Sequence, residues 1–335
     1  MKKFAIPVVI TICVIFSTTL LFYLYYVNSP VDTGTEKRKV NVEIARGSSF
    51  SAVADVLEGS DLIKHKRLFY LLAVLKGAPK QIRAGEYELD SSMTPGEILD
   101  KLLKGDIKGY SIPVPEGFNV CQIASRLSHW KLVNKEKFMK LAFDKEFLSS
   151  LNIPGSSVEG YLFPDTYKFT RSMGEKEVIK FMVRRFRQKV TPEMMQRAAK
   201  LGFTLDEILI LASIIEKEGG VKEEKPSIAA VFYNRLKKGM KLQSDPTVIY
   251  GIEDFDGNLT KKHLMKVTSY NTYRIKGLPP GPICNPGIDS IIAALYPAPV
   301  NYLFFVSKND GSHHFSDNLA SHNKAVIKYQ IKRKR

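Results

Sequence analysis

The first hydrophobic segment of the chain is continuous rather than periodic. Residues 4–27 form a run of 24 residues without a charged side chain, and Lys2 and Lys3 precede it. A helix needs about 20 apolar residues to cross a bilayer. The run therefore predicts a membrane-spanning helix within residues 1–30. A secretory signal peptide is the alternative, but the run is long for one and no small-x-small cleavage site follows it.

After a polar linker at residues 31–39, the pattern changes to short alternating and helical segments. Residues 40–44 and 86–89 alternate as strands do, and residues 49–57 and 67–75 have the apolar spacing of helices. Thr94-Pro-Gly-Glu97 is a capping box with proline at the first helical position, and it predicts a helix that ends near Gly105. The predicted order is β-α-α-β-α over residues 40–108.

The same apolar pattern recurs further along the chain. Positions such as Leu57 and Leu127 match at an offset of 70, and after an insertion, positions such as Tyr87 and Tyr167 match at an offset of 80. Matched spacing over a whole unit indicates an internal repeat rather than chance agreement. Residues 109–182 are therefore a candidate second copy of the first unit.

Composition narrows the classes of function. The chain has 50 Lys and Arg against 34 Asp and Glu, a net charge of +16, which favours nucleic acid, phospholipid or an acidic wall glycan as partner. The two-lysine N-terminus favours a cytoplasmic start, although the basic residues 37–39 follow the helix and weaken this orientation. An extracytoplasmic position for the remaining chain argues against nucleic acid. It would place Cys121 and Cys284 in an oxidising space, and the sequence does not decide whether they pair.

A second long apolar segment ends in candidate catalytic residues. Residues 204–218 read as a capped helix that is apolar nearly all round, which Gly219-Gly220 ends. Glu218 falls on the stripe of Ile208, Leu211 and Ile215. Apolar neighbours and the helix C-terminus should both raise its pKa, as a general acid requires. Glu216 faces elsewhere and could bind a backbone group or a cation. The alternative for both glutamates is a solvated helix end.

A polar and aromatic string follows between residues 232 and 287. Neutral amides and tyrosines suit a polyhydroxylated ligand, whereas phosphate would call for a glycine-rich loop or arginine clusters. Alternatively, the tyrosines belong to the core, the asparagines cap helices and Asp245-Pro246 is a turn. The candidate ligand-binding residues are Asn234, Gln243, Asp245, Tyr250, Asn271 and Tyr273.

Metal binding is not predicted. His313, His314 and His322 match no common ligand spacing, and no Asp or Cys cluster accompanies them. We expect these histidines at turns or at a helix start. The sequence predicts no cofactor. The basic tail at residues 332–335 is expected to be solvated.

Six stretches together resemble the MltG or YceG-like family of membrane-anchored endolytic murein transglycosylases, across essentially the whole chain. They are Glu159–Tyr167, Ala212–Glu218, Val231–Leu236, Leu242–Gly251, Tyr270–Gly281 and Asn318–Lys324. The family often carries Thr-Ala at the positions of Gly219 and Gly220, so the conformation of this helix end is where the chain departs from the pattern.

The resemblance implies an α+β fold. It comprises a single N-terminal transmembrane helix, a LysM-like βααβ unit at residues 40–108, and a mixed α+β catalytic domain at residues 109–335 with its core at 183–335. The LysM-like unit would bind glycan or act as a rigid spacer.

For function, the resemblance implies a lyase, a single-pass protein of the cell inner (plasma) membrane with its catalytic part on the periplasmic side. With Glu218 as catalytic acid, it would cleave the MurNAc-GlcNAc bond within peptidoglycan strands, leave 1,6-anhydro-MurNAc ends and help to terminate nascent strands. Its partners would be glycan strands and, by resemblance, penicillin-binding proteins. Two rivals remain: a hydrolase with Asp245 as second carboxylate, and a non-enzymatic wall-binding scaffold.

Overall fold

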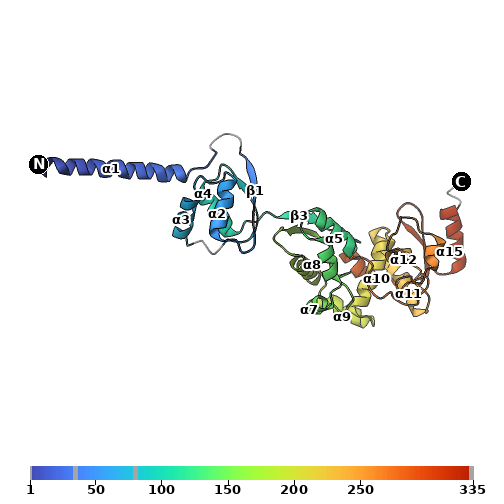
Figure 1. The fold of residues 1–335 in the computed structure, drawn as a ribbon. Coiled ribbons are helices and arrows are strands. Elements are labelled where there is room, and N and C mark those ends of the chain that lie inside the picture. Colours follow the sequence, from blue (N-terminus) through green and yellow to red (C-terminus); the bar gives the residue numbers. More distant parts are fainter. Residues whose placement is uncertain (1, 33–36, 78–81, 332–335) are drawn as a thin grey trace. The chain divides into compact units, whose positions relative to one another are not determined.

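The computed structural model describes residues 2–32, 37–77 and 82–331 and divides the chain into two compact units (Figure 1). The first unit comprises Met1–Tyr110 with Lys168–Met173, and the second comprises Ser111–Tyr167 with Gly174–Arg335. Part of the predicted linker, residues 33–36, and the basic tail at residues 332–335 lie outside the described residues.

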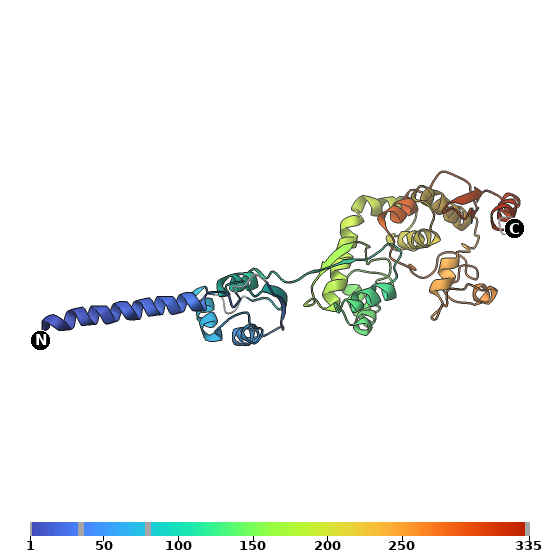
Figure 2. The same cartoon turned by 90° about the horizontal axis from the view of Figure 1, so that it is seen from above.

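The N-terminal apolar run forms helix α1, Lys2–Val27. Figure 2 shows it as a straight helix that extends away from the rest of the first unit. Its window Ile10–Val27 is long and apolar enough to cross a membrane, and only 6% of that window is buried. Exposed apolar side chains of this kind need a lipid environment, as either an anchor or a signal sequence would find.

The remainder of the first unit confirms the predicted β-α-α-β-α order. Strands β1 and β2 are antiparallel, with Lys39 opposite Asp90 and Ile44 opposite Gly85. The elements are β1 (Lys39–Ile44), α2 (Phe50–Gly59), α3 (Lys66–Leu75), β2 (Gly85–Asp90) and α4 (Pro95–Lys104). The predicted capping box opens α4: Thr94 accepts from the Glu97 amide, and Glu97 accepts from the Thr94 amide.

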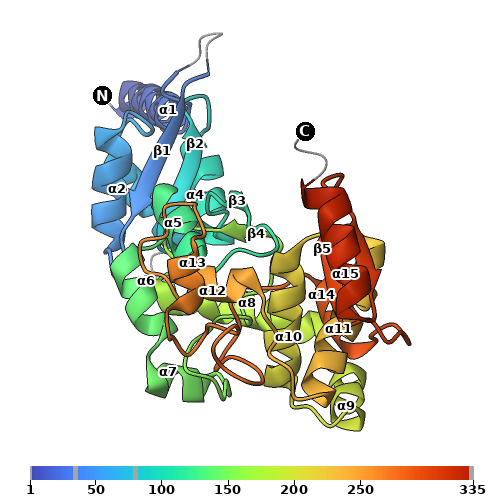
Figure 3. The ribbon, with the colours of Figure 1, turned by 90° about the vertical axis from the view of Figure 1, so that its right-hand side faces the viewer.

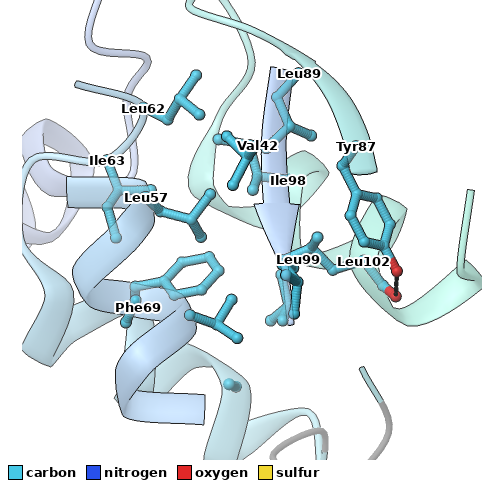
Figure 4. Packing of buried hydrophobic residues seen from close by; sticks show 14 of the residues in the cluster. Val42, Leu57, Leu62, Ile63, Phe69, Tyr87, Leu89, Ile98, Leu99 and Leu102 are labelled. Atoms are coloured by element: carbon cyan, nitrogen blue, oxygen red, sulfur yellow. Dashed lines mark hydrogen bonds between the residues drawn. The ribbon is translucent and has the colours of Figure 1, made fainter. Parts of the chain in front are cut away.

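The core of this unit lies between the two-stranded sheet and its helices (Figure 4). Leu57, Ile98 and Leu99 are fully buried there. Tyr87 is also buried, and its hydroxyl donates to the Arg83 carbonyl at 2.7 Å. Burial of this apolar surface supplies the main driving force for folding of the unit.

The next segment, most of which belongs to the second unit, follows the same order with one additional helix, α7, before its second strand. Strands β3 and β4 pair with each other. Tyr167 donates to the carbonyl of Phe163, four residues earlier, as Tyr87 does to that of Arg83. A duplicated unit would give this correspondence, and the duplication stays a prediction. The elements are β3 (Tyr110–Pro113), α5 (Val120–His129), α6 (Lys135–Ala142), α7 (Lys145–Ser150), β4 (Thr166–Phe169) and α8 (Glu175–Lys189).

The rest of the second unit is mainly helical around α10, which contacts α9, α11, α12 and α14 (Figure 3). The strands β5 and β6 form an antiparallel hairpin, with Phe304 opposite Ser316. The elements are α9 (Pro192–Lys200), α10 (Leu205–Glu218), η1 (Lys222–Glu224), α11 (Lys225–Lys237), α12 (Asp245–Tyr250), α13 (Lys261–Met265), α14 (Ile288–Leu295), β5 (Phe304–Ser307), β6 (His313–Ser316), α15 (Leu319–Val326) and η2 (Ile327–Ile331).

The histidines near the C-terminus correct one prediction. His313 and His314 lie in strand β6 rather than at a turn, and His322 lies within α15. The His313 ring nitrogen lies 2.9 Å from Glu224, and its amide donates to the same carboxylate. The His322 ring stacks on Phe304. Packing within the hairpin region therefore accounts for these side chains.

Candidate active site

The helix that carries the candidate acid forms as the sequence predicts. Thr204 and Glu207 make a reciprocal capping box at the start of α10. Every residue from Ile208 to Ile215 is buried, which explains why the segment is apolar nearly all round. The helix ends at Glu218. Gly219 then takes a φ of +76°, a backbone conformation that favours glycine.

Glu218 is half-buried, and its carboxylate oxygen Oε1 accepts a hydrogen bond from the hydroxyl of Ser244. Burial raises the pKa of Glu218 to about 7, and the negative charge of Asp245 adds to the rise, while the Ser244 hydroxyl and the Arg235 guanidinium oppose it. The predicted direction of the pKa shift is confirmed. A carboxyl group with this pKa is substantially protonated at neutral pH and can donate a proton.

Ser244 is held in place by Thr272, which comes from a distant loop. The Ser244 amide donates to the Thr272 hydroxyl at 2.9 Å, and the Gln243 amide donates to the Thr272 carbonyl at 3.2 Å. The Thr247 and Thr272 hydroxyls lie 2.8 Å apart. All three side chains of Ser244, Thr247 and Thr272 are buried. This network fixes the segment that leads into α12, and it therefore orients the hydroxyl that reaches Glu218.

Three of the predicted ligand-binding residues lie in or beside this segment. Asp245 is exposed and accepts a hydrogen bond from the Tyr273 hydroxyl at 2.7 Å. Gln243 is also exposed, with a φ of +50°. The charges of Asp245 and Arg235 both act on Glu218. Gln243, Asp245 and Tyr273 thus gather with the candidate acid.

The other three predicted ligand-binding residues make contacts inside the protein. The Asn234 amide donates to the carbonyls of Val300 and Tyr302. The Asn271 amide donates to three backbone carbonyls between His263 and Lys266, the shortest bond being 2.6 Å. Asn271 thus holds the C-terminal end of α13, in line with the alternative interpretation that the asparagines cap helices, whereas Asn234 holds the loop before β5. Sugar binding by either asparagine stays untested.

Tyr250 donates its hydroxyl to a buried glutamate, Glu159, at 3.1 Å. Glu159 is 2% exposed and also accepts from the Val120 amide and from Asn285 at 2.8 Å. Burial raises the pKa of Glu159 to about 8 despite these three donors. In the sequence, Glu159 stands out only as the first residue of the Glu159–Tyr167 motif. The hydrogen-bond partners of Glu159 lie far away along the chain, so no local pattern could have revealed that this side chain connects them.

Glu216 has a structural role, one of the possibilities that the sequence left open. Its carboxylate lies 3.3 Å from the Lys225 ammonium and accepts from the Gly287 amide at 3.0 Å and the Ser290 hydroxyl at 2.7 Å. It thereby joins α10 to α11 and to the start of α14. Of Glu216 and Glu218, it is Glu218 that lies beside Ser244.

Sequence reasoning did not select Ser244, Thr272 or Arg235. Arg235 is buried and donates to the carbonyls of Leu242 and Leu303. The signal for Ser244 was its place between two selected residues, Gln243 and Asp245. Its hydroxyl contact with Glu218 becomes visible only when the two segments are brought together.

Among the residues that the structure describes, no group of three or more His, Cys, Asp or Glu side chains could hold a metal ion. Cys121 is exposed and Cys284 is buried, and both are free thiols. The groups that act on the Glu218 carboxyl group are the Ser244 hydroxyl and the charged side chains of Asp245 and Arg235.

A carboxyl group with a raised pKa lies at the end of a buried helix and accepts a hydrogen bond from a hydroxyl group, an arrangement that suits the general acid of an acid–base enzyme. A sequence model of the YceG-like family matches residues 42–328. The chain belongs to this family. The match spans both compact units and includes the whole of the candidate site.

Individual relatives agree with this assignment. The chain is 36% identical over 310 residues to an endolytic murein transglycosylase of Bacillus subtilis, covering 88% of this chain and 85% of the relative. It is 29% identical over 362 residues to one of Streptococcus pneumoniae, covering 98% and 65% respectively. A crystal structure of a YceG-like protein from Listeria monocytogenes is similar with a TM-score of 0.60 and 33% identity, covering 87% of this chain and all of that one.

Proposed function

We propose that the chain, an enzyme of the endolytic murein transglycosylase class, cleaves the MurNAc-GlcNAc bond within peptidoglycan strands and leaves 1,6-anhydro-MurNAc ends. The observation that carries the proposal is the Glu218 carboxyl group, which burial keeps protonated near neutral pH and the Ser244 hydroxyl orients. The names of the curated relatives supply the substrate class.

The proposed reaction uses Glu218 twice. Protonated Glu218 donates to the oxygen that joins MurNAc to GlcNAc, the bond from that oxygen to C1 breaks, and positive charge develops at C1. The carboxylate that remains then takes the proton from the C6 hydroxyl of that MurNAc. At the same time, the C6 oxygen attacks C1 of MurNAc. The new ring closes without water. Intramolecular attack has a high effective molarity, so a second carboxylate is not needed to position a nucleophile.

The neighbours of Glu218 suit both halves of this cycle. Burial and the Asp245 charge favour the protonated form before proton donation. The Ser244 hydroxyl and the Arg235 guanidinium stabilise the ionised form that must exist midway. These opposing influences place the pKa near 7, where the carboxyl group exchanges its proton in both directions at small cost.

Gln243, Asp245 and Tyr273 are the residues that we propose for contact with the sugar. Two of them are exposed, and Asp245 already accepts from the Tyr273 hydroxyl. A sugar hydroxyl could join this pair by donating to the second oxygen of Asp245. Tyr273 offers a flat apolar face with a polar tip, which suits a pyranose ring.

The wider biological role is also a proposal. Helix α1 would serve as an uncleaved anchor of the plasma membrane, with the remainder of the chain on the periplasmic side. The β-α-α-β part of the first unit would act as a LysM-like module or spacer. An anchored endolytic enzyme in this position would end nascent strands beside the wall-synthesis machinery, including penicillin-binding proteins.

The substitution Glu218→Gln tests the acid. It removes the ionisable proton but keeps the size of the side chain, so cleavage of purified peptidoglycan is expected to fall by at least about 100-fold, the usual scale of general acid catalysis. Mass spectrometry of the released glycans measures the result. Glu223→Gln is the matched control, because Glu223 is exposed in the short helix five residues further on, and it should retain activity. Full cleavage by Glu218→Gln would refute the site.

The products of the unmodified enzyme distinguish the rivals. Transglycosylation predicts 1,6-anhydro-MurNAc ends. New reducing ends would instead support a hydrolase in which Asp245 acts as the second carboxylate. A non-enzymatic scaffold would release no glycan, and Glu218→Gln would then leave every measured property unchanged.

A further inference from the structure

Helix α3 of the first unit turns an apolar face outward. Its buried side consists of Phe69 and Ala73. On the opposite side, Tyr70 is 45% exposed, Leu71 50% and Leu75 77%, and Val74 is similarly exposed. These four positions have the spacing of one helical face. A soluble domain normally covers such a face with polar side chains, so this one indicates contact with an apolar partner.

The C-terminal end of α1 lies beside this helix within the same unit. Lys64, just before α3, donates to the Tyr26 carbonyl at 3.2 Å and to the Ser29 hydroxyl at 2.6 Å. Its ammonium also lies 4.1 Å from the centre of the Tyr26 ring. The contacts hold the end of the apolar run against the start of α3. Val27 is accordingly buried, although residues 10–26 of the same helix are exposed.

A groove of about 250 Å³ joins the two helices. Leu24 and Val27 of α1 line one part of it, and Leu68, Leu71 and Leu75 of α3 line another. The apolar surface of α1 thus continues through the groove onto the outward face of α3. The medium that surrounds the end of α1 therefore also surrounds the outward face of α3.

We infer that the outward face of α3, formed by Tyr70, Leu71, Val74 and Leu75, lies in the interfacial layer of the lipid bilayer that α1 crosses. The inference rests on the proposal that α1 is an uncleaved membrane anchor. It adds a second membrane contact, which holds the first unit flat on the bilayer rather than leaving it on a tether. Interfacial helices bury an apolar face in this way to a depth of about 5–10 Å.

Aromatic and basic residues place this contact at the level of the headgroups. Tyr23, Tyr25 and Tyr26 are exposed near the end of α1, and tyrosine gathers at the membrane interface because its ring is amphipathic. Lys66 and Arg67 begin α3 and Lys76 follows it, and within the unit Lys66 also pairs with Asp55 and Lys76 with Asp100. Exposed basic side chains at both ends of an apolar face suit anionic lipid phosphates. A bilayer fits this surface because the apolar face continues from the membrane-spanning end of α1 and is bordered by tyrosine and basic side chains.

Tryptophan fluorescence in vesicles tests the inference. The chain has one tryptophan, Trp130, so Trp130→Phe provides a background without that reporter. In this background, Leu75→Trp places a reporter on the α3 face, and Phe16→Trp places one within α1. Glu43→Trp is the matched control, because Glu43 is an exposed position of β1 in the same unit. Each full-length variant is reconstituted in vesicles of phosphatidylcholine and phosphatidylglycerol that contain lipids with a spin label near the headgroup or near the bilayer centre.

We expect the headgroup-level label to quench the Leu75→Trp variant roughly twofold, and more than the central label does, as the depth of an interfacial helix requires. The Glu43→Trp variant should not be quenched. Adding Leu71→Glu to the Leu75→Trp variant should reduce the quenching, because a charge then opposes insertion. Leu71 is half-exposed, so the change should not affect folding.

Two outcomes would overturn the inference and are distinguishable. If the Phe16→Trp variant is quenched and the Leu75→Trp variant is not, the anchor holds and α3 does not touch lipid. A blue-shifted but unquenched Leu75→Trp variant would mean that a second copy of the chain covers the face. If the Phe16→Trp variant is itself unquenched, the proposed anchor fails first.

Discussion

The pKa of Glu218 results from opposing contacts that the structure identifies individually. Burial and Asp245 favour the protonated form, whereas Ser244 and Arg235 favour the ionised form. The Ser244 hydroxyl is the one of these groups that donates a hydrogen bond directly to the carboxylate. In the proposed reaction, Ser244 would therefore position the acid and also adjust the pH dependence of cleavage.

The substitution Ser244→Ala is expected to lower cleavage roughly 10- to 100-fold, because a hydrogen bond to a charged group contributes about 1.5–3 kcal/mol. Its effect on pH dependence has a definite sign. The hydroxyl stabilises ionised Glu218, so its removal raises the pKa above about 7. Activity that requires the protonated acid falls as pH rises through this pKa, and the basic limb of the profile should therefore move to higher pH.

Profiles of kcat/KM against pH measure this shift. Ser290→Ala is the matched control, since the equally buried Ser290 hydroxyl donates to Glu216 instead. The Ser290→Ala variant should leave the basic limb of the pH profile at its original position. Ser244→Thr, which keeps a hydroxyl group, should restore part of the rate. An unchanged limb in Ser244→Ala would show that this hydrogen bond does not tune the acid.

At the scale of elements, the end of α10 determines where the acid sits. Gly219 has φ and ψ of +76° and −146°, a region that side chains other than glycine rarely reach. Gly220 also has a positive φ, and a Cβ atom there would lie 3.0 Å from the His313 ring. Gly219 and Gly220 therefore form a backbone turn that suits glycine.

The substitution Gly219→Ala should cost about 1–3 kcal/mol of folding stability, since it places a Cβ atom in this strained region. It should also reduce cleavage, because the turn directly follows Glu218. Thermal unfolding and glycan release measure the two effects. Gly174→Ala is the control: its φ is −86° and a Cβ atom there meets nothing within 4 Å. Equal stability of the two variants would contradict the strained turn.

The elements that the sequence predicted well are those with local signals. The capping boxes at Thr94 and Thr204 fixed two helix starts, because both partners lie within three residues of each other. The strands around Val42 and Leu89 followed from alternation. His313 and His314 were misplaced because the partners of β6 lie in β5, and their own sequence carries no strong pattern.

For the whole molecule, division into two units implies two separate cores. Leu57 is fully buried in the first unit, and Cys284 is fully buried in the second. Leu57→Ala should destabilise the first unit by about 2–5 kcal/mol through the cavity that it leaves. Hydrogen exchange in α2 and α4 should accelerate, while labelling of the Cys284 thiol stays slow.

Mass spectrometry of exchanged and thiol-labelled peptides measures both units in one sample. Cys121 is exposed and should react quickly in every variant, which shows that the thiol-labelling reagent is active in each sample. Leu211→Ala, in the buried helix of the second unit, should give the reverse result, with faster labelling of Cys284. Simultaneous loss of protection in both units after Leu57→Ala would show that they unfold as one body.

The sequence by itself determined the apolar run of α1, the β-α-α-β-α order of the first unit, and a buried helix that ends in Glu218. These features depend on spacing over a few residues, which secondary structure translates directly into faces and ends. Only the tertiary structure decided that Ser244, 26 residues away, orients Glu218. It likewise assigned Glu216 to a structural contact with Ser290, 74 residues away. Such hydrogen bonds depend on the tertiary fold, which brings distant segments together, and a local sequence pattern does not contain this information.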